Sequence, residues 1–169
     1  MVVNEVNVIM QKVTLISVGR LKEQFFKSAE EEYLKRLKGF CNTEIIEISA
    51  ETLPQNPSDG LINSALSAEA ERIISKIPKN AEVIPLCIEG KLYSSEELSS
   101  IISHNADFGS GNLCFIIGSS YGLAEKVKAL GKTRLSMSKM TFPHRLARIM
   151  LLEQVYRGYK ILSGGEYHK

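Results

Sequence analysis

The pattern Gly118-Ser119-Ser120-Tyr121-Gly122 is the clearest candidate for chemistry in this chain. It follows an apolar run, and small residues at the end of a strand allow a ligand to approach the main chain closely. The same letters satisfy Gly-x-Ser-x-Gly, the motif that presents a serine nucleophile in hydrolases, here Ser120. The pattern therefore indicates either a tight turn, with or without a ligand, or a hydrolase elbow.

The hydrolase interpretation also needs an acid and a base, for which Glu153 and either His144 or His168 are the candidates. With 169 residues the chain is short for that fold, and no HGGG-type sequence for an oxyanion loop precedes Ser120. The glycine patterns of phosphate-binding and dinucleotide-binding loops are absent as well. We keep the serine hydrolase only as an alternative.

A second candidate is the stretch from Ser136 to Arg145, which combines hydroxyl side chains with two methionines and a proline before a helix. Polar main-chain groups in such a loop can hold an adenosine while the apolar side chains cover its faces. Taken alone, however, these residues favour a simple connector.

The third candidate is the C-terminal sequence Gly164-Gly165-Glu166-Tyr167-His168-Lys169. An aromatic ring, an imidazole and a cation after a glycine hinge suit contact with RNA, by stacking and by phosphate binding. Residues 139–169 contain six Lys or Arg against two Glu, so this segment carries +4 and the remainder −2. Such a distribution fits an anionic partner, but equally a solvated helix face.

The composition limits the class of protein in which these candidate sites can lie. The chain is 44% hydrophobic and 24% charged, which is typical of one globular domain with a real core. We expect that domain over residues 10–169, with residues 1–9 an extension or a misassigned start. Cys41, Cys87 and Cys114 are widely spaced, so the sequence predicts buried thiols in a reducing compartment and no metal site. Without a signal peptide or an apolar run long enough for a membrane span, we expect a cytoplasmic protein.

Hydrophobic patterns predict the elements that must position the candidates. Strands are expected over residues 13–18, 43–48, 82–88, 112–117 and, weakly, 133–136. Helices are expected around residues 26–37, 62–77, 94–102, 123–130 and 143–162, the third opened by a Ser94-x-x-Glu97 capping box.

This alternation predicts an α/β fold, a mainly parallel sheet with helices on both faces. Ligands of such sheets bind at the carboxyl ends of the strands, where Gly118 and Met137 are expected. The last helix has a broad apolar surface from Leu146 to Leu162, which indicates either a dimer interface or deep burial.

Four segments together are highly specific: residues 16–23, residues 135–144, Glu153-Gln154-Val155-Tyr156-Arg157 and Tyr167-His168-Lys169. With them the chain resembles the bacterial large-subunit rRNA pseudouridine N3-methyltransferase H family, of the SPOUT superfamily, from about Met10 to Lys169. The resemblance implies a C-terminal deep trefoil knot, a rare exception to unknotted chains. It also implies a homodimer through the C-terminal helices and a pseudouridine substrate in 23S rRNA of the large subunit or assembled ribosome.

The cofactor implied by the resemblance is S-adenosyl-L-methionine. The family's cofactor-binding positions correspond here to the following residues: Leu86, Gly118, Met137, Ser138, Lys139, Met140, Thr141 and Phe142. For catalysis we expect His168 and Arg148, with His144 as a third candidate, to remove the N3 proton or stabilise the resulting anion. Tyr167 would orient the base, and Lys169, His144 and Arg145 would contact RNA.

The family usually carries Gly-Gly where this chain has Gly118-Ser119. If residue 119 required a positive φ, serine would be strained there and cofactor affinity would suffer. Ser119 is thus the one hint of a second alternative, a non-catalytic ribosome-binding or RNA-binding protein of the same fold.

Overall fold

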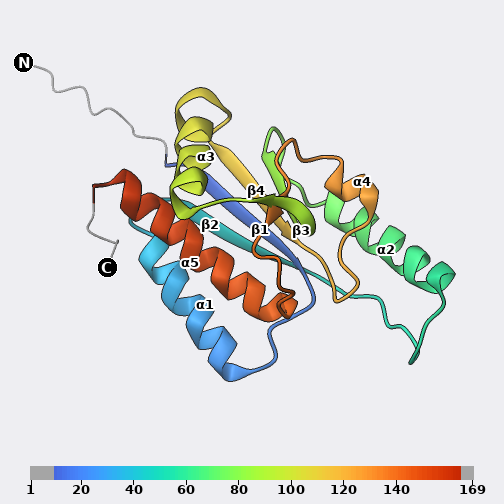
Figure 1. Cartoon of the computed structure of the whole chain (residues 1–169). Helices are drawn as coiled ribbons and strands as arrows, with labels where there is room; N and C mark the ends of the chain where they lie inside the picture. The colour runs from blue at the N-terminus through green and yellow to red at the C-terminus, as the bar shows by residue number, and fades with distance from the viewer. Residues whose placement is uncertain (1–9, 165–169) are drawn as a thin grey trace, which may run out of the picture.

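Five strands and five helices alternate along residues 10–164, the part of the chain that this computed structural model describes. The strands are β1 (Lys12–Val18), β2 (Asn42–Ile48), β3 (Glu82–Leu92), β4 (Asn112–Ile117) and β5 (Leu135–Ser136). The helices are α1 (Gln24–Leu37), α2 (Asp59–Ile74), α3 (Ser95–Phe108), α4 (Glu125–Lys128) and α5 (His144–Leu162). Figure 1 shows the central sheet with helices on both sides.

All strand pairs are parallel, and the spatial order is β2-β1-β4-β3-β5. Ser17 of β1 pairs with Ile117 of β4, so these two strands end level with each other. The loops that follow them therefore leave the same edge of the sheet, as the strand-end argument requires.

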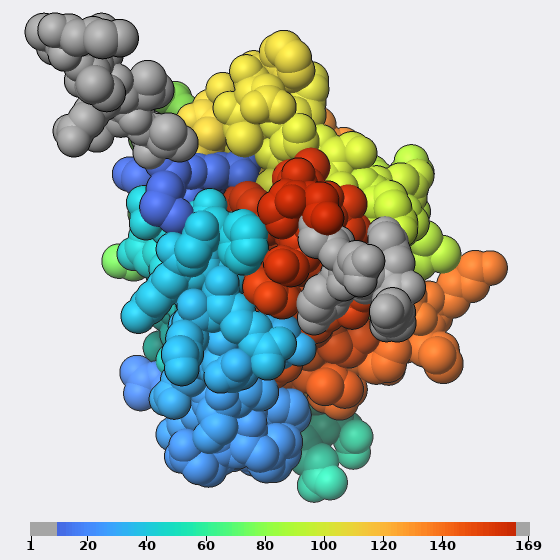
Figure 2. All heavy atoms as spheres, turned by 90° about the vertical axis from the view of Figure 1, so that its left-hand side faces the viewer, coloured from blue at the N-terminus to red at the C-terminus, as the bar shows by residue number. Residues whose placement is uncertain are grey.

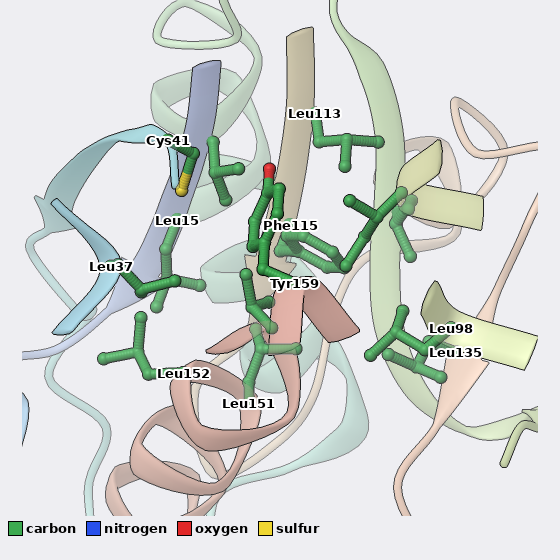
Figure 3. Close-up of a cluster of buried hydrophobic side chains, with 14 of the residues drawn as sticks. Leu15, Leu37, Cys41, Leu98, Leu113, Phe115, Leu135, Leu151, Leu152 and Tyr159 are labelled. Carbon is green, nitrogen blue, oxygen red and sulfur yellow. The ribbon is translucent and has the colours of Figure 1, made fainter. Parts of the chain in front are cut away.

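Helices α1, α3 and α5 cover one face of the sheet. Their apolar side chains interlock with Leu15 of β1 and with Leu113 and Phe115 of β4, as Figure 3 shows. Figure 2 shows α1, the end of α5 and α3 next to one another on this side of the molecule. The sheet's other face is covered by α2 and α4, through Ile73 and Val127.

Much of the apolar surface of α5 is used inside the chain. Leu151, Leu152, Val155 and Tyr159 are all at least 92% buried in the core. The sequence left open whether the apolar surface of α5 is buried within the chain or forms a dimer interface, and these four side chains are buried within the chain. Leu146, in contrast, is 36% exposed. The strand order does not determine whether the chain is knotted, so the trefoil knot stays a prediction.

Candidate functional site

A cavity of about 640 Å³ lies at the carboxyl ends of the strands. Three stretches far apart in the sequence form its wall: residues 86–89 of β3, residues 117–123 after β4, and most of residues 135–144 after β5. Its lining includes seven of the eight residues expected to hold the cofactor; Lys139 is exposed and is not among the lining residues.

The stretch after β4 is a tight turn closed by two glycines. The Gly122 N–H donates to the Ser119 carbonyl at 2.9 Å, and Gly122 has a φ of +86°. A Cβ on Gly118 would lie 2.2 Å from the Gly122 carbonyl oxygen, so no larger residue fits there without moving the main chain. Of the described residues other than glycine, just Asn56 and Asn80 have a positive φ, and the strain considered for Ser119 does not arise.

The loop after β5 is held by its own serines. Ser136 Oγ donates to the Ser138 carbonyl at 3.1 Å, and Ser138 Oγ accepts the Met140 N–H at 3.0 Å. Met137 and Phe142 are half-buried and line the cavity, whereas the Met140 side chain is 69% exposed. The loop thus offers the cavity two half-buried apolar side chains, besides the more exposed Met140, on a main chain held by local hydrogen bonds.

His144 is the first residue of α5 and lines the cavity beside this loop. A Cβ on Gly19 would lie 3.5 Å from its Nε2, so the loop after β1 closes over the imidazole. Burial lowers the pKa of His144; the positive charge of Arg145 lowers it further, while Glu23 opposes the shift. The ring is therefore neutral around pH 7.

The two arginines expected at the site are engaged within the chain. Arg145 Nη1 donates to Glu23 Oε1 at 2.6 Å, and Arg145 is not among the cavity residues. Arg148 has a side chain 2% exposed; it binds both carboxylate oxygens of Glu30 and, at 2.9 Å, Glu47 Oε1. Both guanidinium groups are thus engaged by carboxylates of the same chain, and the roles expected for them in RNA contact (Arg145) and catalysis (Arg148) stay predictions.

The tail residues Tyr167, His168 and Lys169 lie outside the described residues. Sequence reasoning also missed part of the wall: Cys87 and Glu89 of β3, Lys128 of α4 and Ala147 of α5 line the cavity as well. The strand-end rule could have found the first two, since they follow Leu86, but nothing local in the sequence marks the others.

A second cavity of about 380 Å³ adjoins the first and shares Leu135, Ser136 and Met137 with it. Its remaining wall comes from the start of α3, including Leu98, and from Met150 to Gln154 of α5. The candidate hydrolase acid Glu153 lies here, bonded to Arg157 at 2.7 Å, and is absent from the wall of the cavity that contains Ser120.

The described residues contain no group of three or more His, Cys, Asp or Glu side chains arranged to hold a metal ion. None of the helices within residues 10–164 has the length and apolar character needed to cross a membrane.

Comparison with known proteins agrees with this geometry. The model of a family described as "Predicted SPOUT methyltransferase" matches residues 11–168. A Bacillus pumilus protein named ribosomal RNA large subunit methyltransferase H is 44% identical over 157 residues, 93% of this chain and 99% of that protein. A protein of the same name from Clostridium botulinum is 46% identical with the same coverage. A solved structure, a probable methyltransferase from Bordetella pertussis, shares the fold with a TM-score of 0.56 at 14% identity, covering 90% of this chain and 96% of that one.

Proposed function

Because the chain belongs to the SPOUT methyltransferase family, we propose that it methylates the RNA of the large ribosomal subunit, with S-adenosylmethionine as the methyl donor. The finer assignment is N3 of a pseudouridine in 23S rRNA. The observation that carries the proposal is the single cavity in which Leu86, Gly118 and the Met137–Phe142 loop meet.

The residues present suit such a cofactor. A cavity of about 640 Å³ lies within the range of small-molecule sites, about 300–1,000 Å³. Leu86, Met137 and Phe142 supply apolar surface for a nucleoside, and the wall at Gly118 is bare main chain, which allows close approach. This combination of apolar walls and main-chain polar groups is typical of small-molecule and cofactor sites.

S-adenosylmethionine supplies a methyl group already activated by a sulfonium. The chain must therefore orient the accepting nitrogen and exclude water, which contributes much of the acceleration in such transfers. The loop after β5 and the turn after β4 form the walls that do this. The neutral imidazole of His144 beside them can hold a hydrogen bond with the substrate base at physiological pH.

The pseudouridine N3 must lose its proton, and we assign that step to His168, with Tyr167 stacking on the base and Lys169 binding phosphate. These residues lie outside the described part of the chain. For Arg148 we propose a positioning role: its ion pairs hold the first half of α5 against α1 and β2. His144 and Arg145 would then contact RNA at the rim of the cavity.

For the assembly we propose a cytoplasmic homodimer that meets rRNA in the large subunit or the ribosome. The partly exposed Leu146, and Met150, which lines the second cavity, support an interface at α5. In such a dimer the C-terminal tail of one protomer can complete the cavity of the other.

The test is mass spectrometry of 23S rRNA nucleosides from cells with and without the gene. We expect a methylated pseudouridine that is lost on deletion and restored by the wild-type gene, but not by a gene lacking codons 167–169. The truncated protein should still bind S-adenosylmethionine in calorimetry, because it keeps every residue described in the wall of the cavity. Unchanged nucleosides in the deletion strain would refute the proposal.

A further inference from the structure

Glu69 of α2 is a buried side chain that forms no ion pair with any other described residue. Its exposed fraction is 3%, and none of the ion pairs among the described residues includes it. Burying a charged side chain is costly unless donors replace its water. The groups that donate hydrogen bonds to the Glu69 carboxylate are therefore held in place by it.

Two hydrogen bonds reach this carboxylate. The Glu51 N–H donates to Oε1 at 3.0 Å, and the Ser119 hydroxyl donates to Oε2 at 3.0 Å. Glu69 thereby connects three elements: α2, the loop after β2, and the turn after β4 that forms one wall of the proposed cofactor pocket.

The turn needs this anchor because it has space on both sides. Residues 119–121 line the 640 Å³ cavity, and they also line a third cavity of about 210 Å³. Leu53, Ile62 and Leu66 contribute apolar side chains to the wall of this third cavity. An unanchored turn could relax into that space, which would move the wall of the cofactor pocket.

We propose that Ser119 and Glu69 are a positioning pair for cofactor binding: the buried carboxylate, through the serine hydroxyl, holds the turn at the place where the cofactor contacts it. This inference rests on the proposed function. It also explains how a serine is accommodated at residue 119, where its hydroxyl provides a donor that glycine lacks.

The test is calorimetric titration with S-adenosylhomocysteine of the wild type, Ser119→Ala, Glu69→Ala and the double variant. We expect the Kd to rise about fivefold to tenfold in each single variant, since a hydrogen bond to a charged group contributes about that factor or more. The double variant should bind no more weakly than the weaker single one, because both changes break the same bond.

Conservative variants separate positioning from folding. Ser119→Thr keeps the hydroxyl. Glu69→Gln can accept from the Glu51 N–H and donate its amide to Ser119. Ser119→Thr should bind with a Kd near that of the wild type. Glu69→Gln should bind with a Kd between those of the wild type and Glu69→Ala, because a neutral amide makes a weaker hydrogen bond than a carboxylate. The matched controls on α2 are Ser64→Ala and Glu71→Ala, both exposed, which should leave the Kd unchanged.

A second measurement needs no cofactor. Amide hydrogen exchange of residues 119–123 in the free protein should become faster in Ser119→Ala, with exchange in β1 and β4 unchanged. If the wild type binds S-adenosylhomocysteine and Ser119→Ala binds it equally well, the positioning role is refuted while the proposed function stands. A wild-type protein that binds no cofactor would refute the proposed function, and this inference with it.

Discussion

The guanidinium of Arg148 lies between two carboxylates, those of Glu30 in α1 and Glu47 in β2. Arg148→Ala would leave both carboxylates without their buried cation. Removing one partner of a buried pair costs about 3–5 kcal/mol. We expect a loss of that size in the free energy of unfolding, measured by urea denaturation.

Arg36→Ala is the matched control, because Arg36 pairs with Glu32 on the exposed surface of α1. Exposed pairs contribute about 0–1 kcal/mol. Equal losses in the two variants would show that the buried network does not carry the stability assigned to it. The sequence analysis named Arg148 as a catalytic candidate and could not foresee its ion pairs, because the two acids, 118 and 101 residues away, become its neighbours only in the folded chain.

His144 should make stability depend on pH. Burial lowers its pKa below the ordinary value of 6.5, so the unfolded chain binds this proton more tightly than the folded one. Stability is therefore fully present above pH 6.5 and is lost as the pH falls through 6.5 toward the lower pKa of the folded state. We expect urea unfolding between pH 7.5 and 5.5 to show this loss.

In His144→Gln this contribution should vanish, so the variant's unfolding free energy should fall less over the same range. Parallel curves for the two proteins would contradict the assignment. The comparison isolates His144 because other titrating groups, including Glu23, are common to both proteins.

At the scale of elements, the turn after β4 depends on Gly118. The methyl group of Gly118→Ala would lie 2.2 Å from a main-chain oxygen, so the turn must open. Forcing such an overlap typically costs about 1–3 kcal/mol. We expect that loss of stability together with at least about a tenfold weaker Kd for S-adenosylmethionine, because a displaced wall forfeits close main-chain contacts.

Gly39→Ala is the control, since a Cβ there would meet nothing within 4 Å. It should leave both stability and cofactor affinity nearly unchanged. If Gly118→Ala binds the cofactor as tightly as Gly39→Ala does, this turn is not part of the binding wall.

Elements with local signals were predictable from the sequence. Strand β4 begins and ends where the apolar run does, and the capping box of Ser94 and Glu97 is confirmed by both of its hydrogen bonds. Strand β3 was expected to end at Ile88 but continues to Leu92, because its second half pairs with β5. The two strands are more than 40 residues apart, so their pairing leaves no local pattern in the sequence. The spatial order of the strands could not be predicted for the same reason.

In the candidate site, too, features with a local sequence signal were predictable and contacts between distant residues were not. The Gly118 turn and the Met137–Phe142 loop were found because small residues after a strand and a proline before a helix are local features. The hydrogen bond between Ser119 and Glu69, 50 residues apart, could be found only in the folded chain. From the sequence, Ser119 was therefore considered only as a possible source of backbone strain, whereas in the structure its hydroxyl donates to Glu69.

For the whole molecule, the exposed side of α5 matters most. Leu146 is 36% exposed, and Met150 lines the second cavity together with Leu98 and Gln154. We propose that another copy of the chain covers this surface, so a charge placed there would be buried without a partner. We expect Met150→Glu to be monomeric in analytical ultracentrifugation at concentrations where the wild type is a dimer.

Phe108→Glu is the matched control, because Phe108 is 81% exposed at the end of α3. This substitution also replaces an exposed apolar side chain by a charge, but outside the proposed interface. It should remain dimeric. The second cavity shares Leu135 to Met137 with the proposed cofactor pocket, so an interface over this cavity would adjoin the proposed site. If the tail of one protomer completes the site of the other, monomeric Met150→Glu should still bind S-adenosylmethionine but should not methylate ribosomes. A monomer with full activity would show that each chain builds its site alone.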